Sequence, residues 1–369
     1  MCDTRRRCDL LGSAPIEHHD EDGSSSAESE DTSEDSGPED AEEWSDQNTF
    51  RDIPFISRAV INAGPAESPI DFFNLLFNTS FITILVNSVN TLALRVLLEA
   101  THNSSRINRW KNTNFEEMAI FLALLFHMGT IKLNRINDYW STHPLFSLCF
   151  KNYMSRDRFL LILRCLSFQN HHPIADHNPL PITKPNHYTK PIIDYFNNTM
   201  RDIVVPSRNL TIDESVVLWL CGCGFYKYCV KIYVLTESTG MCLKMHMYCG
   251  SNDHLLSGRG HVDKGVHMML TDYYHLGYSL YVDNYYTSVA LAQNLLNKNT
   301  YMTGTLRAKR SGNPSHVNEP LARGSCGSKF NSTGVCVTKY VDRRPVLLIS
   351  TEHQKTQRYC CLQQKHERR

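Results

Sequence analysis

The sequence has no uninterrupted run of apolar residues as long as a membrane span. No stretch approaches about 18 uninterrupted apolar residues, the minimum for a spanning helix, and the nearest candidate, Phe115–Gly129, contains two glutamates and a histidine. We also expect no signal peptide, because Arg5–Arg7 are not followed by an apolar segment. We therefore expect no membrane partner and a reducing compartment in which the 13 cysteines are free thiols.

Basic residues are missing from Glu17–Asp46, which holds 14 Asp and Glu and no Lys or Arg. The segment has almost no aromatic residues, so it cannot bury enough apolar surface to offset the entropy lost on ordering. We predict a disordered acidic tail over residues 1–50. The remainder, Arg51–Arg369, contains 35 Lys and Arg against 22 Asp and Glu, an excess of 13 positive charges. That excess suits a polyanionic partner.

Hydrophobic periodicity predicts an all-α region over residues 51–205. Ser68-Pro69-Ile70-Asp71 and Asn114-Phe115-Glu116-Glu117 are helix start signals, each placing a capping side chain before an acidic first turn. Helices are expected at about 69–100, 114–126, 155–166 and 192–203. The proline-containing stretch 174–191 should connect them with little regular structure.

The period changes after residue 206, where alternating apolar residues predict strands. Strands are expected over 210–219, 231–236, 242–248, 279–282 and 301–307, with helices over 265–274 and 288–297 and further strands over 335–340 and 346–350. Three hairpin-connected strands followed by helix, strand, helix and strand predict an α/β sheet with an antiparallel edge over residues 206–355. Residues 356–369 would form a short tail.

Two aspartates occupy notable positions in this order. Asp213 interrupts the first strand, where aspartate has low propensity, and Asp283 follows the fourth strand. In the ribonuclease-H-like arrangement of such strands the first and fourth lie side by side, which would bring both carboxylates within reach of one ion. Mg²⁺ accepts carboxylate oxygens while keeping waters for substrate phosphates. The pair therefore predicts metal-assisted phosphodiester chemistry.

Both aspartates also have an ordinary interpretation. Asp213-Glu214-Ser215 is compatible with a solvated strand edge. Asp283 is compatible with a polar strand end, where Thr287 or Ser288 would cap the next helix.

Longer motifs resemble those of piggyBac-type transposases and proteins derived from them. They are Met128-Gly129, Asp138-Tyr139-Trp140-Ser141, Met154–Phe159, Thr211–Ser215, Tyr281–Ser288 and Gly304–Arg310. The similarity extends from about residue 50 to about residue 350. It implies a ribonuclease-H-like catalytic core, two-metal DNA strand transfer by three aspartates, and a preference for TTAA targets. By motif position, Asp213 and Asp283 correspond to the first and second aspartates.

The third aspartate of the family lies in a Gly-Gly-Val-Asp-type segment, which this sequence lacks after the strand ending near Ser350. Asp342 precedes that strand in the family pattern and is not its counterpart. Glu352 is the nearest remaining acid and a poor substitute. A carboxylate metal site that loses one ligand loses most of its activity. The resemblance therefore implies an incomplete core, with Mg²⁺ only if activity remains.

The resemblance also implies contacts with the DNA backbone. Arg307, Lys309 and Arg310 match the basic turn of the family and are predicted to contact phosphates. The loop Leu220–Cys229 is shorter than in the family and has one basic residue, so phosphate contacts there should be weaker.

The family's carboxy-terminal zinc module has no counterpart in this sequence. Cys360, Cys361 and His366 lack the paired ligand clusters of a structural zinc site. Cys221, Cys223 and Cys229 have the wrong spacing for a zinc knuckle, and ordinary thiols are the better interpretation.

The leading hypothesis is a nuclear, transposase-derived DNA-binding protein with little or no transposase activity, acting as a homodimer or with a full-length family partner. Nuclear placement follows from the resemblance and from short basic groups such as Arg5–Arg7. One alternative is residual Mg²⁺-dependent nicking or strand transfer at TTAA sites, completed by Glu352 or by a partner subunit. Another is a non-catalytic interaction scaffold, or a truncated isoform whose core folds poorly.

Overall fold

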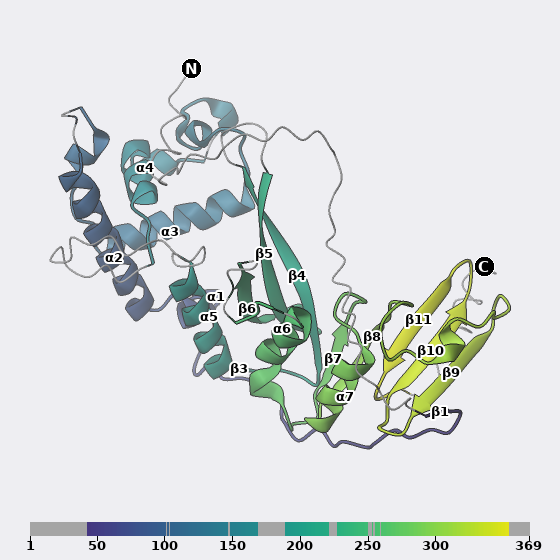
Figure 1. The fold of residues 1–369 in the computed structure, drawn as a ribbon. Helices are drawn as coiled ribbons and strands as arrows, with labels where there is room; N and C mark the ends of the chain where they lie inside the picture. Colours follow the sequence, from purple (N-terminus) through teal and green to yellow (C-terminus); the bar gives the residue numbers. More distant parts are fainter. Residues whose placement is uncertain are drawn as a thin grey trace, which may run out of the picture. The chain divides into compact units, whose positions relative to one another are not determined.

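The computed structural model describes residues 43–100, 102, 104–146, 148–168, 189–220, 227–249, 253, 255–258 and 260–353. The chain divides into two compact units. The sheet unit comprises Met1–Ile56, Arg208–Ser238 and Asp253–Arg369, and the helical unit comprises Ser57–Ser207 and Thr239–Asn252 (Figure 1). Most of the predicted acidic tail and connector, and the tail after residue 353, lie outside the described residues.

The helical unit contains five α-helices among its described residues. They are α1 (Pro69–Leu76), α2 (Thr79–Leu98), α3 (Phe115–Thr130), α4 (Arg156–Arg164) and α5 (Lys190–Ile203), and the short strands β2 (Val60–Ile61), β3 (Val204–Val205) and β6 (Cys242–Tyr248) also belong to this unit. The helix predicted over 69–100 is two helices, because the side chain of Asn78 accepts a hydrogen bond from Phe81 N at 2.9 Å and starts α2 anew. Asn114 caps α3 as predicted, accepting from Glu117 N at 2.9 Å.

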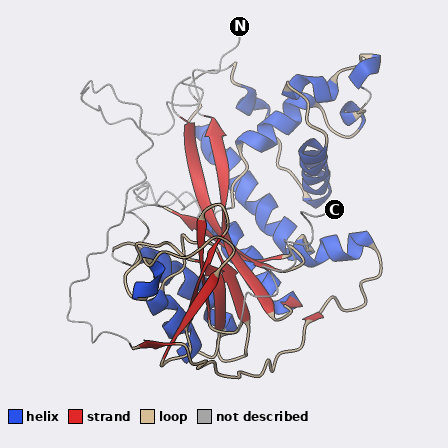
Figure 2. Ribbon diagram, turned by 90° about the vertical axis from the view of Figure 1, so that its right-hand side faces the viewer, coloured by secondary structure: helices blue, strands red, loops and turns tan. Residues whose placement is uncertain are grey.

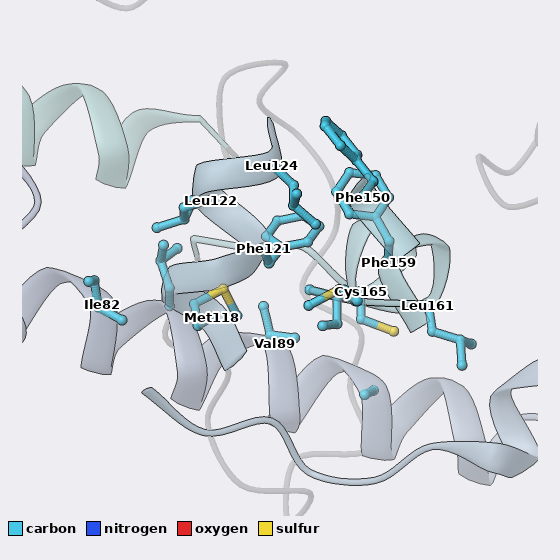
Figure 3. Packing of buried hydrophobic residues seen from close by; sticks show 14 of the residues in the cluster. Ile82, Val89, Met118, Phe121, Leu122, Leu124, Phe150, Phe159, Leu161 and Cys165 are labelled. Atoms are coloured by element: carbon cyan, nitrogen blue, oxygen red, sulfur yellow. The ribbon is translucent and has the colours of Figure 1, made fainter. Parts of the chain in front are cut away.

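The core of the helical unit is a cluster of apolar side chains from α2, α3 and α4 (Figure 3). Leu85 and Val89 on α2, Phe121 on α3 and Phe159 on α4 are fully buried. The rings of Phe121 and Phe159 lie 4.9 Å apart, which adds aromatic contact to the buried area. By length and composition alone α2 could cross a membrane, a test that buried core helices also pass.

The sheet unit contains eight strands among its described residues. They are β1 (Trp44–Ser45), β4 (Asn209–Leu220), β5 (Lys227–Glu237), β7 (Ser279–Val282), β8 (Tyr301–Thr305), β9 (Cys326–Asn331), β10 (Cys336–Val341) and β11 (Pro345–Ser350). Their order across the sheet is β1-β9-β10-β11-β8-β7-β4-β5. Helices α6 (His261–Leu270) and α7 (Val289–Asn297) lie on one face (Figure 1).

The predicted adjacency of the first and fourth strands is confirmed, because β4 pairs with β7 in parallel. β7 in turn pairs with β8 in parallel, and β4 pairs with β5 antiparallel. β4 is paired with β7 only over Asn209–Thr211, whereas it is paired with β5 as far as Leu220. The far halves of β4 and β5 therefore extend as a two-stranded ribbon (Figure 2).

The predicted disordered tail is wrong at its carboxyl end, because residues 43–50 are ordered on the sheet unit. Trp44 and Ser45 pair with β9, and the Phe50 ring lies 5.4 Å from that of Phe330. Thr49 Oγ1 donates to Asn331 O at 2.6 Å. The two aromatic residues supply the apolar contact that the acidic stretch before them lacks.

Phe159 and Phe115 provide a matched test of the helical core. Phe159 is fully buried, whereas Phe115 is 42% exposed. We expect Phe159→Ala to lower the free energy of unfolding by about 3–5 kcal/mol, because it deletes a buried ring and leaves a cavity. Phe115→Ala should cost less than about 1 kcal/mol. Urea titrations of both variants measure the difference, and equal costs would contradict the packing described.

Candidate functional site: an aspartate pair at the end of parallel strands

The register of β4 and β7 sets the two predicted aspartates in line. Asn209 pairs with Ser279, Leu210 with Leu280 and Thr211 with Tyr281. If the strands kept the same register for two more residues, Asp213 would lie opposite Asp283. Neighbouring strands lie about 4.8 Å apart and residues two apart share a face. Both aspartates are exposed, so their carboxylates are accessible to an ion or a ligand.

Each aspartate is held by a local backbone hydrogen bond. Asp213 Oδ1 accepts from Glu214 N at 2.8 Å, and Asp283 Oδ1 accepts from Tyr285 N at 2.9 Å. Tyr286 N also donates to the main-chain oxygen of Asp283, at 3.3 Å. The chain thus turns directly after β7, and we call Asp283–Tyr286 the Asp283 turn.

The ordinary interpretation of this stretch is also correct in part. Ser288 caps α7 by accepting from Leu291 N at 3.0 Å. Thr287, the other candidate cap, donates to Thr305 O on β8 at 2.5 Å instead. The polar residues after Asp283 therefore start a helix and at the same time fasten the Asp283 turn to β8.

A second acid of β4 is paired on the other face of the strand. Glu214 forms an ion pair with Lys231 of β5 at 2.8 Å. The ammonium of Lys231 also lies 4.3 Å from the centre of the Tyr285 ring. Beside them Tyr286 is buried, and burial, together with the charge of Glu214, raises the pKa of its hydroxyl far above the usual range. Glu214, the neighbour of Asp213 in the chain, therefore has a structural role as the ion-pair partner of Lys231.

The basic turn after β8 binds the Asp283 turn. Arg307 Nε donates to Asn284 Oδ1 at 3.2 Å, and Arg310 Nη2 donates to Tyr285 O at 2.6 Å. Lys309 is exposed. From the sequence we predicted that these three basic residues contact DNA. The hydrogen bonds of Arg307 and Arg310 to the Asp283 turn were not predicted. The pairing of Val282 with Gly304 explains them, because the segments that leave two parallel neighbours emerge at the same edge.

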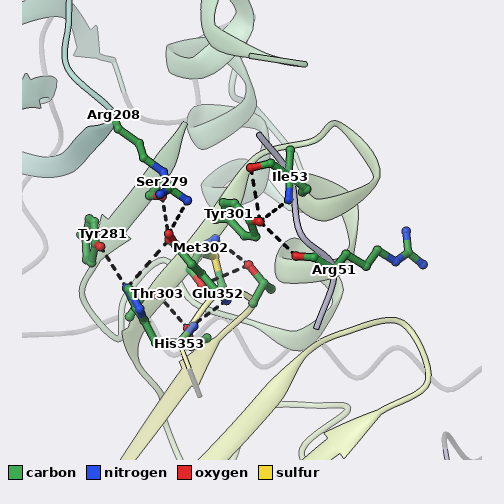
Figure 4. Close-up of polar contacts among 12 residues, drawn as sticks. Arg51, Ile53, Arg208, Ser279, Tyr281, Tyr301, Met302, Thr303, Glu352 and His353 are labelled. Carbon is green, nitrogen blue, oxygen red and sulfur yellow. Dashed lines mark hydrogen bonds and ion pairs between the residues drawn. The ribbon is translucent and has the colours of Figure 1, made fainter. Parts of the chain in front are cut away.

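Glu352 lies at the other end of β7. It accepts hydrogen bonds from Arg208 Nη2 and, at 2.6 Å, from Ser279 Oγ (Figure 4). Its side chain is 14% exposed. Ser279 and Asp283 are four residues apart, which spans roughly 13 Å along a strand. Glu352 is therefore not placed to complete a site with Asp283.

The residues present are better suited to binding one hard cation through two carboxylates than to forming a metal site with three carboxylates. Two exposed carboxylates that follow the paired ends of neighbouring strands match the few protein oxygens that Mg²⁺ takes while it keeps several waters. Among residues 43–353, apart from the gaps in the described ranges, no group of three or more His, Cys, Asp or Glu side chains is arranged to hold a metal ion.

Of the residues that the zinc prediction concerned, Cys229 lies on β5, where it pairs with Leu218 of β4. Cys221, Cys223, Cys360, Cys361 and His366 lie outside the described residues.

The comparisons with known proteins define the class. A family model described as Transposase IS4 matches residues 68–369, so the chain belongs to this family of transposases. The resemblance to piggyBac-type transposases that the sequence motifs indicated is confirmed.

One similar solved structure is a piggyBac transposase, determined by cryo-EM in a synaptic complex with hairpin DNA. The match has a TM-score of 0.67 and 21% sequence identity, and it covers 81% of this chain. The chain matches 64% of the length of that transposase chain. At this identity the likeness shows a shared fold.

Substitution of Glu352 and of Asp342 tests which of these two acidic residues stabilises the fold. We expect Glu352→Ala to lower the free energy of unfolding by about 1–3 kcal/mol, because it leaves Arg208 and Ser279 without their shared acceptor. Asp342→Ala should change it by less than about 0.5 kcal/mol, since its contact with Arg323 at 3.6 Å is exposed on both sides. Thermal unfolding of both variants measures this. Weaker binding of divalent ions by folded Glu352→Ala would contradict the placement of Glu352 away from the aspartate pair.

Proposed function

We propose that this chain is a transposase-derived nuclear protein that binds duplex DNA through the sheet end carrying Asp213 and Asp283, with little or no transposase activity. The observation that supports the proposal is the parallel pairing of β4 with β7, since the same register continued two residues further would put these carboxylates opposite each other, while Glu352 is bonded to Ser279 at the start of β7. In the proposed assignment, the strands of the sheet unit form a ribonuclease-H-like core. The domain limits predicted from the sequence are part of the same proposal.

Asp213 and Asp283 would hold one Mg²⁺ in this proposal. When bound, the ion would polarise a phosphate oxygen of the substrate. The chain's own residues fix the ligands: the Asp283 turn is bonded through Tyr285, and Asp213 lies on a strand paired with two neighbours. Two carboxylates balance the charge of one divalent ion but not of two. Because the negative charge is too small to hold two ions, we expect low or absent strand-transfer activity.

DNA would lie along a rim of exposed cations beside the aspartate pair. Lys309 and Arg307 are exposed on the turn after β8, and Arg343 and Arg344 are exposed just before β11. Leu306 N donates to Leu347 O at 2.9 Å, which fastens the start of that turn alongside β11. Exposed arginines and lysines that follow an edge are suited to phosphate contacts, which position a duplex without reading its sequence.

Two other functions remain testable against this one. Residual Mg²⁺-dependent nicking would need a further ligand from a second subunit, because Glu352 is engaged by Arg208 and Ser279. Incubation of supercoiled plasmid with Mg²⁺ and with EDTA distinguishes residual nicking from DNA binding without cleavage. Nicking that occurs only with Mg²⁺ would favour residual nicking. A scaffold without a DNA role would show no duplex binding at low salt, where counterion release favours binding.

An excision assay tests the low activity. We expect the wild type and Asp283→Asn to give the same background level of excision of a TTAA-flanked element, because the two carboxylates cannot neutralise a pair of ions. An active piggyBac transposase in the same cells is the positive control. Excision that depends on Asp283 would overturn the inactive assignment.

The salt dependence of duplex binding tests the cationic rim. We expect Lys309→Gln to make the slope of log Kobs against log salt shallower by about 0.9, because one phosphate contact is lost. Arg51→Gln is the matched control, since Arg51 is exposed and belongs to the segment bonded to Tyr301, at the opposite end of β8. A gel-shift series from about 50 to 200 mM salt measures both slopes. An unchanged slope for Lys309→Gln would remove Lys309 from the interface.

A further inference from the structure

The main chain of Tyr285 links Arg310 to the carboxylate of Asp283. Tyr285 N donates to Asp283 Oδ1 at 2.9 Å, and Tyr285 O accepts from Arg310 Nη2 at 2.6 Å. The backbone N–H of Tyr285 is thus bonded to the aspartate, and its carbonyl oxygen is bonded to the arginine. A displacement of Tyr285 would move the carboxylate oxygen that it holds.

Arg310 is itself held in place on several sides. Its side chain is half-buried, and its backbone N donates to Arg307 O at 3.2 Å. Asn313 Nδ2 donates to Arg307 O at 2.9 Å and to Ala308 O at 3.1 Å, which closes the basic turn. Burial raises the pKa of the Asp263 carboxyl on α6, and the charges of Arg310 and His261 oppose that rise, so Asp263 interacts electrostatically with Arg310. The guanidinium therefore has a fixed position and an acidic neighbour.

Lys309, one residue earlier, is placed differently. It is exposed and, within the described part of the chain, makes no hydrogen bond or ion pair. Its ammonium is available to a phosphate, whereas the Nη2 of Arg310 is already used on Tyr285. Adjacent cations of one turn therefore have different environments.

We propose that Arg310 is a positioning residue, which holds the Asp283 turn so that the Asp283 carboxylate stays in register with Asp213, and that it does not contact DNA. The inference rests on the proposed function for one consequence only, the binding of a divalent cation by the aspartate pair. Its structural consequence, order in the Asp283 turn, is independent of any ion.

The test compares Arg310→Gln and Arg310→Lys with Lys309→Gln and with the Arg51→Gln control. The first readout is amide hydrogen exchange in residues 283–288 without metal. We expect exchange there to be at least about tenfold faster in Arg310→Gln, because a charge-assisted hydrogen bond to the turn is lost. Lys309→Gln and Arg51→Gln should exchange as the wild type does. Arg310→Lys keeps the charge but has no planar fork, and we expect an intermediate rate.

The second readout is Mn²⁺ affinity, and the third is the salt slope of duplex binding. Arg310→Gln should weaken Mn²⁺ binding by about 10- to 100-fold, as loss of a ligand's supporting partner does. Its salt slope should equal that of the wild type, whereas Lys309→Gln should lose about 0.9 of the slope. This contrast separates positioning from phosphate contact.

Wild-type exchange in residues 283–288 of Arg310→Gln, or a salt slope reduced by about 0.9 in that variant, would overturn the inference. If the wild type binds no Mn²⁺, the metal part of the proposed function fails, and the exchange rates still decide the role of Arg310. If Arg310→Gln does not fold, Arg310→Lys provides the comparison: faster exchange confined to 283–288 supports positioning, and unchanged exchange overturns it.

Discussion

The parallel pairing of β4 with β7 is the constraint on which the site depends. A slip of one residue would turn Asp213 to the opposite face of the sheet, because side chains alternate along a strand. Several close approaches hold the register. Ser279 N donates to Arg208 O at 2.9 Å, and Glu352 then bridges the side chains of both residues. On the other side of β7, Gly304 of β8 lies so close to that strand that an added Cβ would be 2.2 Å from Val282 O. Glu352 thus fastens the two strands at the end opposite the aspartate pair.

Much of this arrangement could be predicted because it follows from local patterns. The order of strands and helices predicted β4 and β7 as neighbours, and the pairing confirms it. Capping side chains such as Ser288 and Asn114 marked helix starts through short-range hydrogen bonds. Such signals need only a few consecutive residues, so a single sequence displays them.

The missed features depend on contacts between segments far apart in the chain. β9 contains Gly327 and Ser328 in place of a strong alternating pattern, and it becomes a strand through pairing with β10. Trp44 and Ser45 are ordered by that same strand. From the sequence only the charge of Arg310 is known. A charged turn after a strand is equally compatible with contact to solvent, to DNA or to a neighbouring loop. Only the positions of β7 and β8 side by side distinguish these.

The charges around the aspartate pair favour a polyanion over a second metal ion. Lys231 forms an ion pair with Glu214, and Arg310 donates a hydrogen bond to Tyr285 O, so these cations serve the fold. Arg307 and Lys309 remain exposed beside the two carboxylates, which leaves this edge near neutrality. One bound divalent ion would make the edge positive and attractive to phosphates. A second ion would need carboxylates that the described residues do not bring there, since Glu352 is bound by Arg208. In the proposed function, the same balance that would weaken two-metal chemistry would leave a surface suited to the DNA backbone.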